Sequence, residues 1–258
     1  SEVGNVHEMS NHAFYILNDE KTHLNFKSNA LIQAKKFGIE ETNIAEFELK
    51  TQFRCSGSDA YLQWLDKALE ILDIDAARFD PKMEFKIFDS PLELHKVIKL
   101  KNIQDNKARM VAGYCWDWIS KKDPTKFDIT IPEFSYKARW NLASYGNEWI
   151  INPQSVDEVG CIHTCQGLEV DYVGVIVGAD LRIEGGGLVS VPSGRARTDK
   201  SLNGYKGERK RREHEADLKA DQIIRNTYRT LMSRGMKGCF VYFTDPEVAE
   251  YFKNHLPR

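Results

Sequence analysis

No apolar run in this sequence approaches the length of a membrane span. The longest nearly apolar run extends from Val173 to Ala179, whereas a helix that crosses a bilayer needs about 20 apolar residues. Internal repeats and low-complexity tracts are also absent from the sequence. A transmembrane protein, a repeat solenoid and a disordered linker are therefore not expected.

An excess of charge of one sign is missing as well. The 258 residues contain 36 Lys and Arg against 38 Asp and Glu, for a formal net charge of −2. This balance excludes a protein that coats nucleic acid through overall positive charge, so any such site must be a local patch. With 41% hydrophobic and 29% charged residues, the composition is that of a folded chain of one large or two small domains.

Paired cysteines are absent too. The five cysteines are an odd number and are scattered along the chain: Cys55, Cys115, Cys161, Cys165 and Cys239. This pattern predicts reduced thiols in a cytoplasmic protein and not a disulfide framework. His163 lies between two of them, but a structural zinc site needs four ligands and no second pair follows. No motif supports a Cys–His nucleophile either, so we expect no metal site and no thiol catalysis.

Strand-like and helix-like segments alternate along the chain. Short apolar or alternating runs predict strands, and apolar residues at helical spacing between capping signals predict helices. The predicted strands are 14–17, 47–53, 84–88, 108–116, 159–163, 171–177 and 238–243, and the predicted helices are 28–37, 60–72, 91–103, 208–233 and 246–254. Residues 121–149 are expected to form a loop or hairpin excursion, residues 181–191 a hairpin, and residues 193–207 a loop. This order predicts an α/β fold with a mostly parallel sheet and flanking helices.

The segment 158–178 carries the clearest chemical signal. A predicted strand leads into the polar turn His163-Thr-Cys-Gln-Gly-Leu-Glu169, and Asp171 starts another apolar strand. Open α/β sheets bind ligands at polar turns that follow parallel strands. Gly167 would let the backbone approach a phosphate or a ribose closely, and Glu169 could accept hydrogen bonds from a sugar hydroxyl.

This turn resembles motif V of superfamily 1 helicases. Residues 225–243, with Arg225, Tyr228 three positions later and Arg234 nine positions later, resemble motif VI. Residues 51–55 (TQFRC) resemble motif IV, in which an arginine follows an aromatic residue. Each motif alone is weak, but three of them in the family's order are fairly specific.

A closer resemblance is to helicase-like NTPases related to the helicase region of group III Schlafen proteins. It is carried by residues 52–66, 108–118, 140–141, 160–181 and 225–242, and it covers most of the chain from about Phe14 onward. The resemblance implies a second RecA-like motor domain of the P-loop NTPase type at 51–258. It also implies that residues 1–50 are a remnant of the end of the first such domain.

The same resemblance implies roles for particular residues. The implied roles are charge stabilisation in catalysis for Arg54 and Arg234, nucleotide binding for Gln166, Gly167, Glu169, Arg225 and Tyr228, and nucleic-acid binding for His163 and Thr164. The two catalytic arginines are expected to be exposed at one edge of the domain, facing the phosphate. Structural alternatives stay open at four positions. Arg234 could offset a helix dipole, and Arg54 has a structural alternative of the same kind. Arg225 and Tyr228 could orient their helix, and Tyr228 could also pack in the core.

One departure from the family's pattern decides what the chain alone can do. The phosphate-binding loop ending in Gly-Lys-Ser/Thr is absent from the sequence, and the acidic Mg²⁺-binding motif is not recognisable. We therefore expect the C-terminal half of a motor that is inactive alone. The resemblance implies ATP and Mg²⁺ for the intact protein, with DNA or RNA, expected as a single strand, and the first RecA-like domain as partners. The rival interpretation is a non-catalytic nucleic-acid-binding or protein-docking module that keeps the motor fold.

Two further features have a structural and a functional interpretation. The run 206–219 contains both charge signs with partners four positions apart, which favours a solvated helix with weak ion pairs. A phosphate-contacting patch at 209–212 is the alternative. Four tryptophans, at positions 116, 118, 140 and 149, are expected mostly as core anchors, although one or two could stack on bases.

Overall fold

The computed structural model of the chain describes residues 55, 59–74, 83–141, 149–162, 164 and 169–256, and the backbone of residues 6–8 and 14–16. The chain divides into two compact units, Ser1–Lys50 and Thr51–Arg258. Within the first unit, β1 (Val6–Glu8) and β2 (Phe14–Ile16) form an antiparallel pair. The predicted helix at 28–37 and the predicted strand at 47–53 lie outside the described residues.

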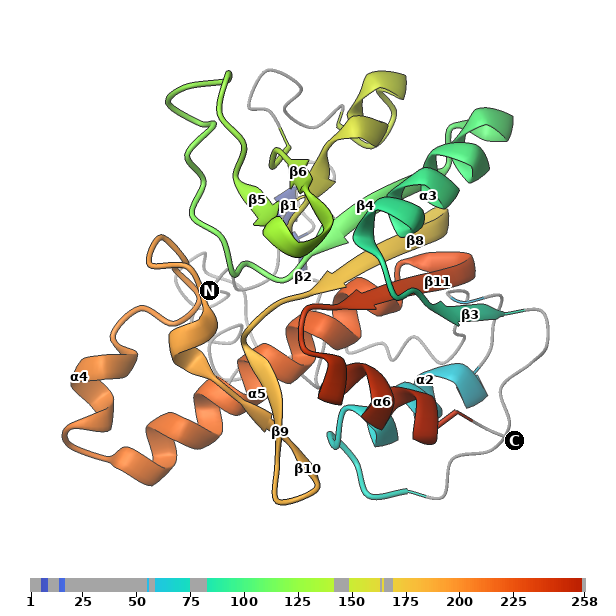
Figure 1. The fold of residues 1–258 in the computed structure, drawn as a ribbon. Helices are drawn as coiled ribbons and strands as arrows, with labels where there is room; N and C mark the ends of the chain where they lie inside the picture. Colours follow the sequence, from blue (N-terminus) through green and yellow to red (C-terminus); the bar gives the residue numbers. More distant parts are fainter. Residues whose placement is uncertain are drawn as a thin grey trace. The chain divides into compact units, whose positions relative to one another are not determined.

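A five-stranded, all-parallel sheet is the centre of the second unit (Figure 1). Its strands, in the spatial order β3-β11-β8-β4-β7, are β3 (Glu84–Ile87), β11 (Gly235–Phe243), β8 (Val170–Val177), β4 (Ala108–Ala112) and β7 (Val159–Gly160). No two neighbouring strands in this order are consecutive in the sequence. Parallel neighbours are joined through crossover segments that leave the sheet and return to it. This sheet confirms the predicted α/β class and is consistent with a RecA-like fold.

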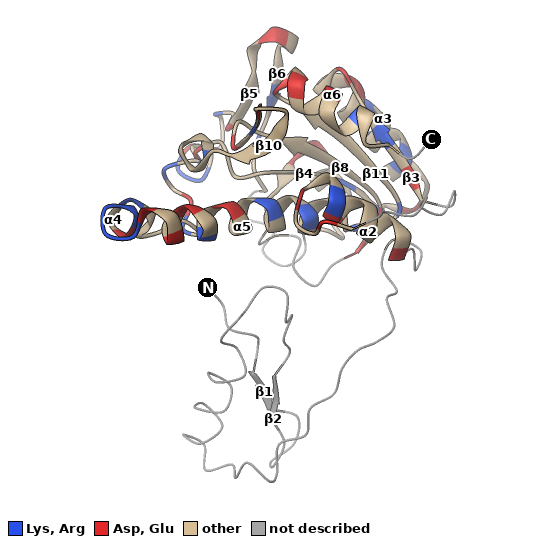
Figure 2. Cartoon of the chain, turned by 90° about the horizontal axis from the view of Figure 1, so that it is seen from below, with Lys and Arg blue, Asp and Glu red and all other residues tan. Residues whose placement is uncertain are grey.

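Alternate residues of the central strands enter two hydrophobic cores, because successive side chains of a strand point to opposite faces. The core with α2 (Asp59–Ala68), α5 (Glu213–Met232) and α6 (Pro246–Asn254) takes Val111, Val173, Val175, Cys239 and Val241. The other core, with α3 (Pro91–Asp105), β5 (Ile129–Ile131) and β6 (Tyr136–Ala138), takes Met110, Ile176, Phe240 and Tyr242. Figure 2 shows α5 and α2 on one side of the sheet and α3 on the other.

Local capping signals place α3 and α6 where the sequence predicts them. Ser90 Oγ accepts a hydrogen bond from the Glu93 backbone N–H at 3.5 Å, and Pro91 occupies the first helical position. Asp245 caps α6 in the same way, since its carboxylate accepts from the Glu247 N–H at 2.9 Å. Each cap satisfies an N–H group that the first turn of a helix leaves without an intrahelical partner.

The long helix predicted at 208–233 is wrong, because the chain breaks into α4 (Tyr205–Arg209) and α5. Arg212 has φ −146° and ψ 72°, which is not a helical conformation. The break lets α4 pair with the start of α5: Arg209 contacts Glu213 at 2.8 Å and Asp217 at 3.0 Å. Instead of ion pairs within one helix, the structure has pairs between two, and Lys219 of α5 likewise lies 3.8 Å from Glu208 of α4. The hairpin predicted at 181–191 is confirmed as β9 (Leu181–Glu184) and β10 (Gly187–Ser190).

A buried arginine joins β4 to the loop that precedes β7. Arg109 is 1% exposed, and its guanidinium donates to Ser155 Oγ (2.9 Å), Asn102 Oδ1 (2.6 Å) and the carbonyl oxygens of Ile150 (2.6 Å) and Asn152 (2.9 Å). Burial lowers the pKa of Arg109 to about 10, so the side chain remains charged at neutral pH. Neutral oxygens, rather than a carboxylate, solvate this cation.

His95 on α3 is a buried titratable group with both ring nitrogens engaged. Nδ1 lies 2.9 Å from the Tyr136 hydroxyl, and Nε2 lies 2.8 Å from the Val156 carbonyl oxygen. The carbonyl can only accept, so in the neutral ring Nε2–H donates to it and Nδ1 accepts from Tyr136. Desolvation lowers the pKa of His95 below its usual value. The folded protein therefore favours the neutral imidazole.

This lowered pKa predicts a loss of stability in mild acid. Below the ordinary histidine pKa of about 6.5, the unfolded chain binds a proton that the folded chain resists, so the free energy of unfolding falls as the pH falls. We expect urea unfolding between about pH 7.5 and pH 5.5 to show a larger loss for the wild type than for His95→Gln. Equal losses in the two proteins would contradict the assignment, because the other titrating groups are common to both.

Candidate functional site

Arg234 lies where α5 gives way to β11, at the amino end of the central sheet. Its carbonyl oxygen accepts from the Val170 N–H at 3.1 Å, which places it beside the first residue of β8. The register of β11 shifts between Gly235 and Gly238. A Cβ at Gly235 would lie 2.1 Å from the Gly238 carbonyl oxygen, so the bulge that directs Arg234 out of the strand requires glycine there.

The segment around α2 holds the end of α5 in place. Tyr61 Oη donates to the carbonyl oxygen of Met232 at 3.1 Å, and Cys55 Sγ donates to that of Ser233 at 3.6 Å. Both carbonyls belong to the helix end, where intrahelical donors run out. Burial, followed by the nearby Cys239 and Cys55, raises the pKa of the Tyr61 phenol. Tyr61 therefore remains a donor, and the position of Arg234 is set by contacts across the core.

The structure brings two of the predicted nucleotide-side residues together. Glu169 is exposed and directly precedes Val170, whose N–H contacts the Arg234 carbonyl. Arg54, Gln166 and Gly167 lie outside the described residues. Cys55, which follows Arg54 in sequence, contacts Ser233, which precedes Arg234.

The expectation that Arg234 is solvent-accessible is wrong, because its side chain is buried, with 7% exposure. Its neighbours Met232 and Ser233 are bonded to Tyr61 and Cys55, so this helix end packs against the segment around α2. Sequence spacing identifies a helix end, but it does not report how that end packs.

Arg225 is tied to the interior of the domain. Its guanidinium donates to the carbonyl oxygens of Leu69 and Leu188, both at 2.6 Å, and to Asp221 Oδ1 at 2.7 Å. It also lies 3.4 Å from a carboxylate oxygen of Glu70. These bonds join α5 to the turn after α2 and to β10, as expected for an arginine that orients its helix. Nucleotide binding by Arg225 finds no support in these contacts.

Tyr228 reaches the opposite, carboxyl end of the sheet and is fully buried. Its hydroxyl donates to Asp180 and accepts from the Gly178 N–H at 3.0 Å. A Cβ at Gly113 would lie 2.0 Å from this hydroxyl, so the ring fills the space just beyond β4. Burial, and then the charge of Asp180, raise the pKa of Tyr228. These contacts match the core-packing alternative for Tyr228.

Asp180 and Arg195 form a buried ion pair that sequence reasoning missed. Arg195 Nη1 lies 3.1 Å from Asp180 Oδ2, and Arg195 Nε lies 2.6 Å from Asp199 Oδ2. The side chains of Arg195 and Asp180 are 2% and 0% exposed. The signal in the sequence is a charged residue, Asp180, directly after the apolar run 173–179. The loop that contains Arg195 is therefore anchored to the sheet next to Tyr228.

Removal of the Tyr228 hydroxyl should weaken this corner of the core. Tyr228→Phe leaves the buried Asp180 and the Gly178 N–H without this partner, so we expect the free energy of unfolding to fall by about 2 kcal/mol. Tyr251→Phe is the matched control, because its hydroxyl makes one exposed bond to Glu70 at 3.0 Å. The control should cost less than about 0.5 kcal/mol. Urea unfolding measures both changes, and similar losses in the two variants would refute the buried network.

Thr164 follows β7 and lies at a different edge from Arg234. Its hydroxyl donates to Asn141 Oδ1 at 2.8 Å, and its backbone N–H donates to the Cys161 carbonyl oxygen at 3.0 Å. The side chain is half-buried. His163, its predicted partner in binding nucleic acid, lies outside the described residues. Three of the described candidates thus fall on two edges: Arg234 and Glu169 on one, and Thr164 on the other. The other two, Arg225 and Tyr228, bond within the interior of the domain.

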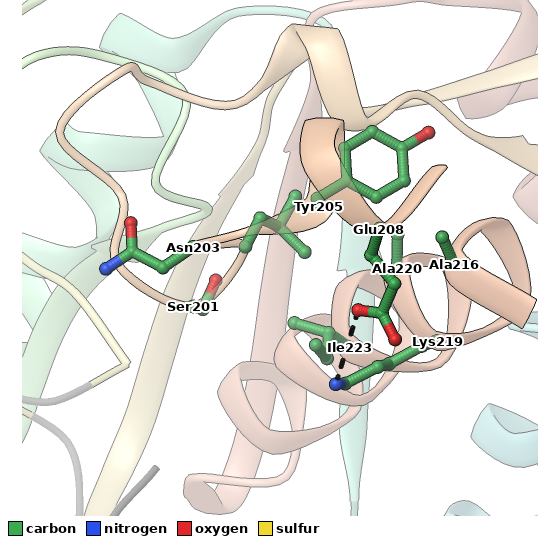
Figure 3. Close-up of a pocket in the computed structure, with 9 residues that line it drawn as sticks. Ser201, Asn203, Tyr205, Glu208, Ala216, Lys219, Ala220 and Ile223 are labelled. Carbon is green, nitrogen blue, oxygen red and sulfur yellow. Dashed lines mark ion pairs between the residues drawn. The ribbon is translucent and has the colours of Figure 1, made fainter. Parts of the chain in front are cut away.

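Two hollows of very different size lie beside α4 and α5. The pocket in Figure 3, between α4, α5 and the preceding loop, has a volume of about 20 Å³, which is room for one water molecule. Glu208 and Lys219 pair within it at 3.8 Å. A broad open groove of about 1080 Å³ runs between β10 and the α4–α5 pair. No set of three or more His, Cys, Asp or Glu residues in the described part of the chain is arranged to bind a metal ion.

Comparison with known protein sequences identifies a family for this chain. The sequence model of the family described as Schlafen group 3, DNA/RNA helicase domain matches residues 6–245. An uncharacterized protein of Saccharomyces cerevisiae is 27% identical over 219 residues, which are 79% of this chain and 47% of the yeast protein. The chain therefore spans about half the length of the curated relative it matches. No solved structure matches the chain significantly. Among the described helices, none has the length and apolarity to cross a bilayer.

Proposed function

This chain belongs to the Schlafen group 3 DNA/RNA helicase domain family, and we propose that it is the second RecA-like domain of a superfamily 1-type, nucleic-acid-dependent ATPase. The reaction of the longer protein is ATP hydrolysis coupled to movement along DNA or RNA. The observation that supports this proposal is the hydrogen bond from the Val170 N–H, next to Glu169 in the sequence, to the Arg234 carbonyl oxygen at 3.1 Å.

Charge at this edge suits a nucleotide held between two domains. Arg234 would stabilise the negative charge that develops on the transferred phosphate, which is the role of an arginine finger. Glu169, exposed beside it, would accept hydrogen bonds from the ribose. Arg54 joins this group in the proposal because Cys55 and Ser233, the sequence neighbours of the two arginines, are in contact.

The burial of Arg234 defines how it would act. A guanidinium in a water-poor environment interacts with a phosphate more strongly than one in bulk water. With 7% of its surface exposed, the side chain must turn toward the domain edge before it contacts a phosphate. We propose that docking of the other motor domain, with its bound nucleotide, provides the anion that draws it out.

ATP fits this chain only in part. The sequence lacks a Gly-Lys-Ser/Thr loop, and the described residues offer no ligand set for Mg²⁺. When bound, Mg²⁺ neutralises the phosphate oxygens, and we assign the groups that hold it to the other half of the longer protein. The residues of this chain contribute the cations and the ribose contact.

Two measurements test the proposal. The chain alone should turn over no ATP above background, because its sequence lacks the Gly-Lys-Ser/Thr loop that wraps the phosphates. In the longer protein, Arg234→Ala should lower ATP turnover by about a thousandfold, as loss of an arginine finger does. Binding of a fluorescent ATP analogue should change far less, since the arginine acts mainly on the transition state.

Arg182→Ala is the matched control for this substitution. Arg182 is exposed and pairs with Glu184 at 2.8 Å, so its loss should leave turnover near the wild-type value. Because Arg234 is buried, thermal unfolding of each variant must accompany the assay, and Arg234→Lys provides a variant that keeps the charge. A well-folded Arg234→Ala enzyme with near-normal turnover would refute the proposed role.

A non-catalytic module is the second candidate, and the missing phosphate-binding loop favours it. In that case the sheet would support nucleic-acid or protein binding without hydrolysis. The two candidates separate on the longer protein: ATP turnover stimulated by nucleic acid supports the motor. A longer protein that binds nucleic acid and shows no turnover supports the module.

A further inference from the structure

Residues 118–139, which we call the arm, leave the sheet after β4 and return through the β5–β6 hairpin (Figure 1). One buried carboxylate closes its base. Asp128 accepts from the Ser120 N–H at 2.7 Å and hydroxyl at 2.6 Å, and from the Trp140 N–H at 2.8 Å. The arm is therefore a defined structure, held to the domain at both of its ends.

The arm carries an excess of positive charge on a chain whose net charge is −2. Its cations are Lys121, Lys122, Lys126, Lys137 and Arg139. Asp123 and Glu133 are the carboxylates at its surface, because Asp128 is buried. Lys126 pairs with Asp123 at 3.7 Å, and the remaining cations make no ion pair with the described residues. A local basic surface of this kind attracts a polyanion.

Exposed apolar side chains lie among these cations. Phe127 is 40% exposed and Ile119 is 47% exposed. The Arg139 guanidinium lies over the Phe127 ring, 4.3 Å from its centre, and it also donates to the carbonyl oxygens of Lys126 and Thr125. A flat ring beside a guanidinium fixed by hydrogen bonds is the kind of platform on which nucleic-acid bases stack.

The arm leads directly to the predicted nucleic-acid residue Thr164. Beyond β6 the chain continues through Trp140 to Asn141, whose N–H donates to the Val159 carbonyl oxygen at 3.0 Å. Asn141 Oδ1 accepts from the Thr164 hydroxyl at 2.8 Å. A strand that touches Thr164 would therefore meet the base of the arm next.

We propose that the arm is a binding surface for single-stranded nucleic acid, with a base stacked on Phe127 and phosphates bound by the surrounding lysines and Arg139. This inference rests on the proposed function, because the family and Thr164 supply the reason to expect a nucleic acid. Interleaved cations and an aromatic face favour a single strand over an acidic protein segment, which would use the charges and leave the ring unused.

Binding of fluorescein-labelled oligodeoxythymidine and oligouridine of about 12 nucleotides, a length within the usual site sizes, tests the arm on the full chain by anisotropy. Phe127→Ala should weaken affinity about tenfold and leave the salt dependence unchanged. Lys121→Gln with Lys122→Gln should flatten the slope of log affinity against log salt by about 1.4. Lys96→Gln with Lys253→Gln, an equal charge change on exposed lysines of α3 and α6, should alter neither quantity.

Photocrosslinking gives a readout that does not depend on a variant folding. An oligonucleotide with 5-iodouracil should crosslink to the wild-type chain at residues 118–139, with Phe127 as the main site found by peptide mass spectrometry. Crosslinks confined to other segments would overturn the inference. Competition by polyglutamate as strong as that by the oligonucleotide, with no effect of Phe127→Ala, would also overturn it and indicate a docking face for acidic protein.

The outcomes distinguish the arm from the proposed function. If the arm variants bind like the wild type while Thr164→Val binds weakly, the arm is not the binding surface. Nucleic-acid binding as part of the proposed function then stands. If the wild-type chain binds neither oligonucleotide at low salt, the inference about the arm is refuted, and so is nucleic-acid binding in the proposed function. Nucleotide turnover in the longer protein remains a separate test of the ATPase.

Discussion

The pairing of β8 with β11 determines where every candidate residue lies. The two strands run parallel from Val170 beside Gly235 to Val177 beside Phe243. Alternate residues of both strands enter the two cores, so a slip by one position would exchange the residues of one core with those of the other. The same pairing sets Arg234 beside the first residue of β8 and leaves Gly178 at the far end.

Under the proposed function, the nucleotide contacts lie at one edge of the sheet and the nucleic-acid contacts at the other. Glu169 and Arg234 occupy the amino end of the central strands, while Thr164 and the arm follow strands that end on the other side. Helix α5 touches both regions, since Met232 is held by Tyr61 and Tyr228 reaches Gly178. A displacement of α5 would therefore be felt at both edges, which is the connection that a motor needs between nucleotide and nucleic acid.

Local signals in the sequence predicted much of the fold. The Ser-Pro and Asp-Pro pairs at the starts of α3 and α6 report capping that depends on a few neighbouring residues. Continuous apolar runs predicted parallel strands covered on both faces. The break before Glu213 was missed because the acidic residues of α5 stabilise α4 across a turn as readily as they would stabilise one continuous helix.

The sequence predicted which residue types form the candidate site. It did not predict the burial and the bonding partners of those residues. Motif spacing placed Arg234 at a helix end, but that end is bonded to Tyr61, which lies 171 positions before Met232. The Asp180–Arg195 pair depends on a loop returning to the sheet, and no pattern of spacing encodes that return. Arg225 illustrates the same limit, since its bonds reach Leu69 and Leu188, residues 156 and 37 positions away.

The contacts of α2 have a consequence for how the chain folds during synthesis. Tyr61, Cys55 and Trp64 bond to carbonyls 171, 178 and 191 positions later. At a synthesis rate of about 5–20 residues per second, these partners emerge on the order of ten seconds or more after α2. Throughout that interval the apolar face of α2 has none of these partners, and the newly made chain must keep it from associating with other molecules. The element that helps to position Arg234 in the finished domain thus docks long after it has been synthesised.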